Sequence, residues 1–211
     1  MATFQVQIED MVGTVGGSSS DTTAITSFLT DGAKEVINLL PSHLLRLCAS
    51  EVTFTPQVAG SESSASTLNT GKIFNVRRND GTIDQPCRRI SSSLKGRASD
   101  SDDMDYATAT DPVYYVENNY LNILPSSSST VGKYSEVQYP SVSYGDSSIA
   151  SFPDEAEYAV VLYAAVKGIE RIITDTIGTD EDIELAQARK DQYTWLEAQY
   201  AKAIQAVVGT Q

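Results

Sequence analysis

The spacing of apolar residues changes twice along this chain of 211 residues. Up to about residue 50 the apolar residues follow a helical repeat, between about 51 and 150 they alternate as in strands, and from 151 the helical repeat returns. These two patterns place apolar side chains on different faces, so one cannot replace the other in a core. The sequence therefore predicts an α+β fold, with a helical bundle made from both ends of the chain and an inserted small antiparallel β-region with long loops.

The first segment, residues 1–50, is predicted to be helical. Ser20 or Asp21 is expected to cap the main helix, and Pro41 is expected to end or kink it. Ser42 should then cap a short continuation rich in leucine. The apolar positions of the main helix lie at helical spacing and are Ile25, Phe28, Leu29, Val36, Ile37 and Leu40.

The second segment, residues 51–150, contains strands and polar loops. The run EVTFTPQV alternates like a strand, and KIFNVRRNDGTIDQPCRRI predicts two strands joined at Asn79-Asp80-Gly81. The run PVYYVENNYLNILP predicts a second hairpin, with strands at 113–117 and 120–124 around Asn118 and Asn119, which tolerate a left-handed turn. The Ser- and Asp-rich stretches between these runs are expected to be loops.

The third segment, residues 151–211, is predicted to be a helical hairpin. Ser151 is expected to cap its first helix, Pro153 fits the first turn, and Gly178 is expected to end that helix. In the second helix Ala186, Tyr193, Tyr200 and Val207 recur every seven residues. The first helix carries more apolar surface than an exposed helix needs. We therefore expect it to pack against other helices of this chain and against other copies of it.

The sequence contains no pattern typical of a catalytic, cofactor or metal site. His43 is the only histidine, Cys48 and Cys87 are the only cysteines, and both cysteines are expected to be buried thiols. The G-x-S-x-G, Walker A, H-E-x-x-H and C-x-x-C motifs do not occur. An enzyme using only carboxylates is the alternative, but no pair of acidic residues stands out. The sequence thus predicts a protein that is not an enzyme and has no cofactor.

An acidic run, SDSDDMD, carries Asp100, Asp102, Asp103 and Asp105. Carboxylates are the ligands that calcium prefers, but the glycine and the final glutamate of an EF-hand loop are missing. A solvated acidic loop is the expected structure, and weak calcium binding is the alternative.

A local basic cluster contains Arg77, Arg78, Arg88 and Arg89, and the nearby Lys95 and Arg97 extend it. We expect these side chains to pair with the acidic loop or with an acidic surface of a neighbouring copy. Contact with nucleic-acid phosphate is the alternative, although interleaved aromatic residues for base stacking are missing. The net charge of −13 argues against a protein that wraps DNA or binds anionic membranes. No apolar stretch approaches the length needed to span a bilayer.

Tyrosine is abundant in the chain, with 11 residues, and it suits both half-buried packing and interfaces between proteins. We predict that an aromatic and apolar set on the two C-terminal helices contributes to contacts within and between subunits. This interface set comprises Tyr158, Tyr163, Tyr193, Leu196, Tyr200 and Val207.

The order of these features resembles that of a known protein family. DPVYYVENNYLNILP, VQYPSVS and FPDEAEYAVVLYAAVKGIE follow one another, and the last run holds Pro153-Asp154-Glu155 and Tyr163-Ala164-Ala165. Over roughly residues 51–208 this arrangement resembles virion structural proteins of tailed bacteriophages, and more narrowly the head-to-tail adaptor (connector) proteins of the phage neck.

The resemblance implies a homo-oligomeric ring, commonly of twelve copies, beneath the portal protein. The ring would contact the portal and tail or neck proteins, and DNA would pass through it without specific binding. The protein would be made in the host cytoplasm and be located in the virion. Another virion role, as tail terminator, tail completion protein or head-decoration protein, is the nearest alternative. A nucleic-acid-binding module that uses residues 77–97 is a more distant one.

Overall fold

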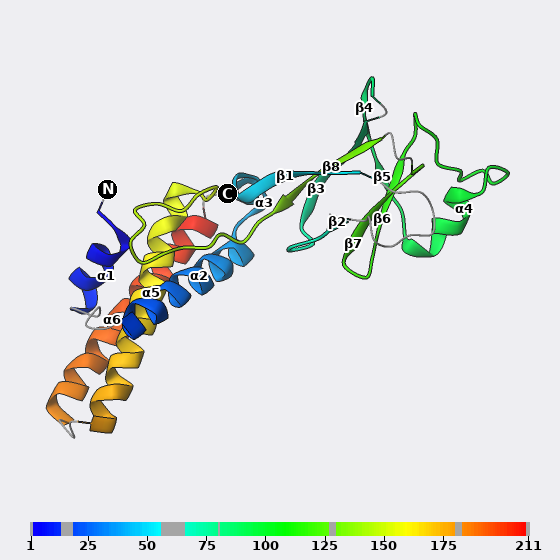
Figure 1. The fold of residues 1–211 in the computed structure, drawn as a ribbon. Coiled ribbons are helices and arrows are strands. Elements are labelled where there is room, and N and C mark those ends of the chain that lie inside the picture. Colours follow the sequence, from blue (N-terminus) through cyan, green and yellow to red (C-terminus); the bar gives the residue numbers. More distant parts are fainter. Residues whose placement is uncertain are drawn as a thin grey trace. The chain divides into compact units, whose positions relative to one another are not determined.

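The computed structural model describes residues 2–13, 19–55, 66–79, 81–126, 130–179 and 183–209. The chain divides into two compact units (Figure 1). Unit 1 contains residues 1–48 and 139–211 and is helical, whereas unit 2 contains residues 49–138 and is built mainly of strands. The predicted α+β fold, with helices from both chain ends packed together and antiparallel sheets inserted between them, is confirmed.

Unit 1 is organised around one central helix. α5 packs against α1, α2 and α6, which explains why it is apolar on nearly every side (Figure 1). The predicted helical hairpin of α5 and α6 is confirmed. The helices of this unit are α1 (Phe4–Val12), α2 (Ser19–Leu39), α3 (Ser42–Leu45), the 3-10 helix η1 (Arg46–Cys48), α5 (Asp154–Thr179) and α6 (Ile183–Val208).

The start of α5 differs from the sequence prediction. Ser151 does not cap this helix, because it adopts a φ of 54° and the helix begins three residues later, at Asp154. The first turn instead contains a buried carboxylate, that of Glu157, whose Oε1 accepts the backbone N–H of Ile149 at 2.6 Å. The acidic first turn therefore fixes the preceding loop as well as matching the helix dipole.

The other predicted helix limits are confirmed in part. Ser20 and Asp21 lie inside α2, so neither of them caps it. α2 ends at Leu39, just before Pro41, as predicted. Ser42 does not cap α3, because it is the first residue of that helix and Pro41 occupies the N-cap position. α5 ends at Thr179, one residue after Gly178. For the last helix the sequence suggests Thr179 or Asp180 as the cap. Thr179 is the last residue of α5, and residue 180 lies outside the described residues, as do the side chains of the first residues of α6.

The segment 139–150 belongs to unit 1, although the sequence places it with the strands. It runs along α2, where the backbone N–H and C=O of Val142 both bond to Thr30 Oγ1 at 3.2 Å. It then reaches the start of α1, where the backbone N–H of Phe4 donates to the carbonyl of Asp146 at 2.7 Å. Neither partner is near this segment in sequence, so local patterning did not reveal the contact.

Helix α1 lies in residues 1–50, which the sequence predicts to be helical, but a separate helix at residues 4–12 was not predicted. Its apolar residues Phe4, Ile8 and Val12 are four positions apart and all buried. Thr3 caps its start by accepting the N–H of Val6. A helix of nine residues has little stability alone, so packing against α5 provides most of it.

Unit 2 consists of two four-stranded sheets. Their orders are β1-β8-β3-β4 and β2-β7-β6-β5, and all pairs are antiparallel except β5 with β6. The strands are β1 (Ala49–Phe54), β2 (Ser66–Thr67), β3 (Ile73–Asn79), β4 (Asp84–Pro86), β5 (Arg88–Arg89), β6 (Val113–Glu117), β7 (Tyr120–Leu124) and β8 (Val131–Val137). A 3-10 helix, η3 (Ser92–Leu94), and the short helix α4 (Lys95–Ser99) follow β5.

Both predicted hairpins of unit 2 are confirmed. Asn79 pairs with Asp84 across the first turn, and Glu117 pairs with Tyr120 across the second. Asn118 and Asn119 take φ values of 52° and 66°, as a tight turn between twisted strands requires. The main core of the unit is formed from both sheets and contains Leu68, Val76, Leu121, Ile123 and Tyr134.

Candidate functional site

The basic cluster is divided between the two sheets of unit 2. Arg77 and Arg78 lie on β3, opposite Pro86 and Gln85 of β4. The chain leaves this sheet at residue 87, and β5 then pairs with β6 of the other sheet. The four predicted arginines therefore do not form one surface.

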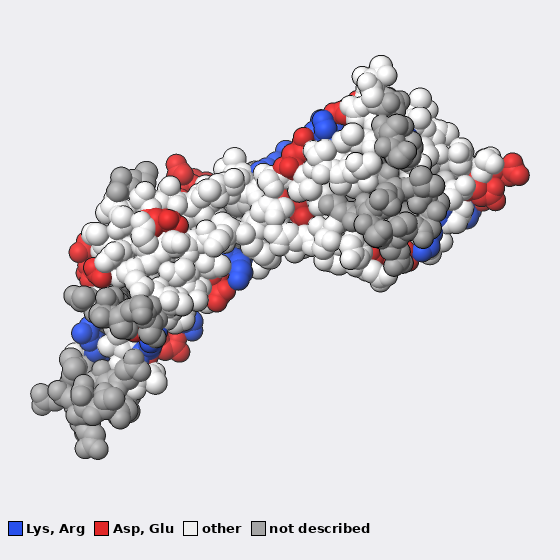
Figure 2. Space-filling model, in the orientation of Figure 1, with Lys and Arg blue, Asp and Glu red and all other residues white. Residues whose placement is uncertain are grey.

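Two members of the cluster, the half-buried Arg77 and the exposed Arg88, pair with carboxylates of the same chain. Arg77 bonds to Glu51 and, at 3.4 Å, to Asp84, while Arg88 bonds to Asp111 at 3.3 Å. The pKa of Asp84 is lowered, first by the side-chain hydrogen bond from Asn79 and then by nearby cations. On the face shown in Figure 2, the described basic side chains lie singly among acidic ones and form no continuous basic surface.

Arg78 is not available as a surface contact, which corrects one of the predicted charged contacts. Its side chain is 5% exposed, and its Nε donates to the carbonyl oxygen of Pro125 at 2.9 Å. Its buried Nη1 has no hydrogen-bond partner among the residues that the structure describes. The thiol of Cys87 lies in the same region, and burial raises its pKa to about 12, with the Arg78 charge opposing the shift. The Cys87 thiol is therefore a poor nucleophile.

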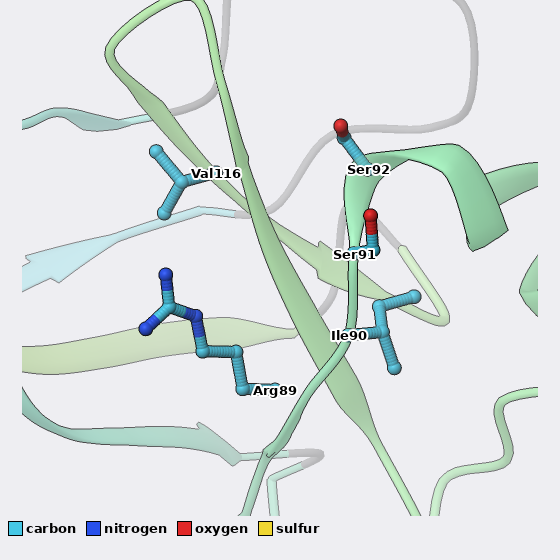
Figure 3. A pocket seen from close by; sticks show the side chains of 5 residues that line it. All are labelled: Arg89, Ile90, Ser91, Ser92 and Val116. Atoms are coloured by element: carbon cyan, nitrogen blue, oxygen red, sulfur yellow. The ribbon is translucent and has the colours of Figure 1, made fainter.

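Arg89 differs from its neighbours. It is exposed, and no carboxylate of the described residues lies within ion-pair distance of it. Its side chain borders an open depression that is also lined by Ile90, Ser91, Ser92 and Val116 (Figure 3). This depression is lined by hydroxyl and apolar groups beside a guanidinium that pairs with no carboxylate of the described residues.

The acidic loop is held by Arg97. The Arg97 guanidinium bonds through Nε to Asp103 at 3.0 Å and through Nη2 to Asp105 at 3.0 Å. The hydrogen bond from Arg97 is the largest cause of the lowered pKa of Asp103. The expected pairing between the basic cluster and the acidic loop is therefore present at Arg97. Among the described residues no group of acidic, histidine or cysteine side chains is arranged to hold a metal ion.

The remaining candidate reactive residues are one histidine and two cysteines. His43 lies exposed on α3, whereas Cys48 is buried at the end of η1 in the same unit. Cys87 lies in unit 2. None of the helices in the described parts of the chain has the length and hydropathy that a membrane span requires.

Most of the predicted interface set is used inside unit 1. Tyr163 and Tyr200 pack edge to face, with ring centroids 5.9 Å apart, and the Tyr200 hydroxyl donates to Glu35 at 2.9 Å. Leu196 and Val207 are buried and Tyr193 is half-buried. Of the six residues only Tyr158, at 51%, is more exposed than buried. The apolar surface of α5 is thus covered by helices of the same chain. Its burial does not require a second copy of the protein.

Comparison with known proteins does not identify a family for this chain. No protein-family model matches the chain, and no curated protein matches it in sequence.

Proposed function

We propose that this protein is a structural subunit of a tailed-phage neck, where it forms a ring-shaped head-to-tail adaptor beneath the portal. The observation that supports the proposal is the order of its parts. Helices from both ends of the chain form one bundle, and a two-sheet β-unit is inserted between them. The family that the sequence resembles has the same order of parts.

The charge distribution fits the passage of DNA without binding. Unit 1 contains 17 of the 28 acidic residues but only 7 of the 15 basic ones. An acidic surface repels phosphate, and no counterion is released when DNA approaches it. A ring lined by such a surface would let DNA move through it.

The role of a nucleic-acid-binding module is less well supported. Such a module needs several free cations along the path of the phosphates. In this chain Arg77, Arg88, Lys95 and Arg97 bond to carboxylates, and Arg78 is buried. A tail terminator or head-decoration protein remains the nearest alternative, since it would use the same kind of scaffold with a different symmetry.

The decisive experiment combines the purified protein with the portal ring of the virus that encodes it. We expect co-sedimentation, and we expect electron micrographs to show one ring of this protein with the symmetry of the portal. Binding to the tail tube with six-fold or three-fold symmetry would instead identify a tail terminator. Absence of the chain from purified virions would contradict a structural role.

A further inference from the structure

Met104 is the most exposed large apolar residue of the described part of the chain, with 100% of its surface open to solvent. It lies on the acidic loop, where the Arg97 guanidinium bonds to the residues on both sides, Asp103 and Asp105, at 3.0 Å each. The backbone N–H of Asp105 also donates to Asp103 Oδ1 at 2.9 Å. These bonds hold the loop on either side of Met104, so its side chain is kept in solvent and does not fold back onto unit 2.

The other methionine that the structure describes has a different environment. Met11 is half-buried on α1, a helix that packs against α5. The next residue, Val12, is buried, and the carbonyl oxygen of Met11 accepts a hydrogen bond from the side chain of Gln192. Met1 lies outside the described residues. The structure thus distinguishes a fully exposed thioether from one that neighbouring helices partly cover.

Exposure decides which of two thioethers an oxidant reaches first. With a peroxide, a lone pair of the methionine Sδ attacks the outer oxygen and the O–O bond breaks. The leaving hydroxide or alkoxide then takes the proton from the transferred oxygen. The sulfur loses two electrons and becomes a sulfoxide, while the peroxide gains them and leaves as water or an alcohol. The reaction therefore needs no acid or base from the protein.

We propose that Met104 is a reversible oxidation site, at which peroxides convert the thioether to the sulfoxide while the rest of the chain keeps its structure. The sulfoxide replaces an apolar group with a polar one. Because the Met104 side chain is fully exposed, the added oxygen displaces no packed group. The same oxygen on Met11 would enter the packed surface around α1 and weaken it.

The modification changes the polarity of the acidic loop without changing its fold. In the reduced form the loop carries an apolar group between the carboxylates of Asp103 and Asp105, and in the oxidised form this part of the loop is polar throughout. Methionine sulfoxide reductases reverse the step, and two thiols supply the electrons, giving a disulfide and water. Such an enzyme must enclose the oxidised side chain, which full exposure permits. The inference goes beyond the neck role and does not depend on it.

The test is oxidation of the full-length protein by dilute hydrogen peroxide, followed by peptide mass spectrometry. Cleavage by trypsin and a glutamate-specific protease separates the methionines, since Met11 then falls in residues 10–34 and Met104 in residues 98–117. We expect Met104 to gain one oxygen atom about tenfold faster than Met11 in the folded protein. In denaturing urea the two rates should become similar, because folding is what distinguishes the two side chains.

Three further measurements test the rest of the inference. Protein oxidised only at Met104 should keep the urea midpoint of the untreated protein, since no packed contact is lost. Met104→Leu is the matched variant, because it keeps an apolar side chain of similar size. It should remove the fast-reacting methionine and leave the rate at Met11 unchanged. Reductases for both sulfoxide epimers, supplied with dithiothreitol, should restore the unmodified Met104 peptide.

The inference is overturned if Met11 reacts as fast as Met104 in the folded protein, or if urea leaves the ratio of the two rates unchanged. It is also overturned if oxidation of Met104 lowers the urea midpoint, or if the reductases leave the sulfoxide in place. None of these measurements involves the portal, so their outcome is separate from that of the neck proposal.

Discussion

The ring of Tyr163 on α5 lies directly against the backbone of Gly32 on α2. A Cβ atom placed on Gly32 would come within 2.7 Å of Tyr163 Cδ1, closer than real Cβ contacts allow. From the sequence, Gly32 is only a residue that weakens α2. In the structure it is the point where two helices approach each other, and the Tyr163 ring it admits also packs against Tyr200.

Replacing Gly32 with alanine should therefore destabilise unit 1. The gain in helix propensity is about 1 kcal/mol, while forcing a methyl group against a packed ring costs about 1–3 kcal/mol. We expect a lower midpoint in urea unfolding followed by far-UV circular dichroism. Gly96→Ala is the control, because nothing lies within 4 Å of a Cβ there and α4 should not be weakened. A stability for Gly32→Ala above that of the wild type would show that α2 and α5 can move apart at no cost.

Glu157 and Glu155 should respond differently to the same substitution. Both lie in the first turn of α5, but Glu157 is buried and accepts the N–H of Ile149, whereas Glu155 is exposed. Glu157→Ala leaves that N–H without its partner and should lower the unfolding free energy by about 1–3 kcal/mol. Glu155→Ala removes only a dipole interaction and should cost less than about 1 kcal/mol. Equal losses in chemical denaturation would mean that the buried hydrogen bond contributes nothing.

Tyr144 should make the stability of unit 1 sensitive to alkaline pH. Burial and the hydrogen bond to Glu9 raise its pKa from the usual value of 10.0 to about 12. The neutral phenol is favoured in the folded state, so its contribution is complete below pH 10 and is lost as the pH rises through about 12. Urea midpoints measured between pH 9 and pH 12 should fall less steeply for Tyr144→Phe than for the wild type. Tyr158→Phe, at an exposed position, should follow the wild-type curve.

Arg97 should control the order of the acidic loop more than the stability of unit 2. Arg97→Gln removes the bonds to Asp103 and Asp105, so amide hydrogen exchange at residues 99–106 should become faster. The pKa of Asp103, measured by NMR titration, should rise toward its usual value, because the largest cause of its lowering is removed. Arg88→Gln should change neither quantity in this loop. Unaltered exchange in Arg97→Gln would show that backbone turns alone hold the loop.

The sequence by itself determined where the two hairpins of unit 2 and the three long helices of unit 1 lie. Local turn chemistry located the hairpins at residues 79–84 and 117–120, since the Asn and Gly residues there allow the left-handed conformations of tight turns. Helical periodicity located α2, α5 and α6 within a few residues of their limits. These features depend on neighbouring residues only, which is why a pattern in the sequence reveals them.

The tertiary structure decided what each side chain contacts. It assigned residues 139–150 to unit 1, made α5 a central helix covered by its own chain, and divided the arginine cluster between two sheets. It also distinguished Arg78, which is buried, from Arg89, which is exposed and borders an open depression. Contacts of this kind join residues far apart in the chain, and their energies depend on burial and distance. Neither quantity is encoded in the local spacing of residue types.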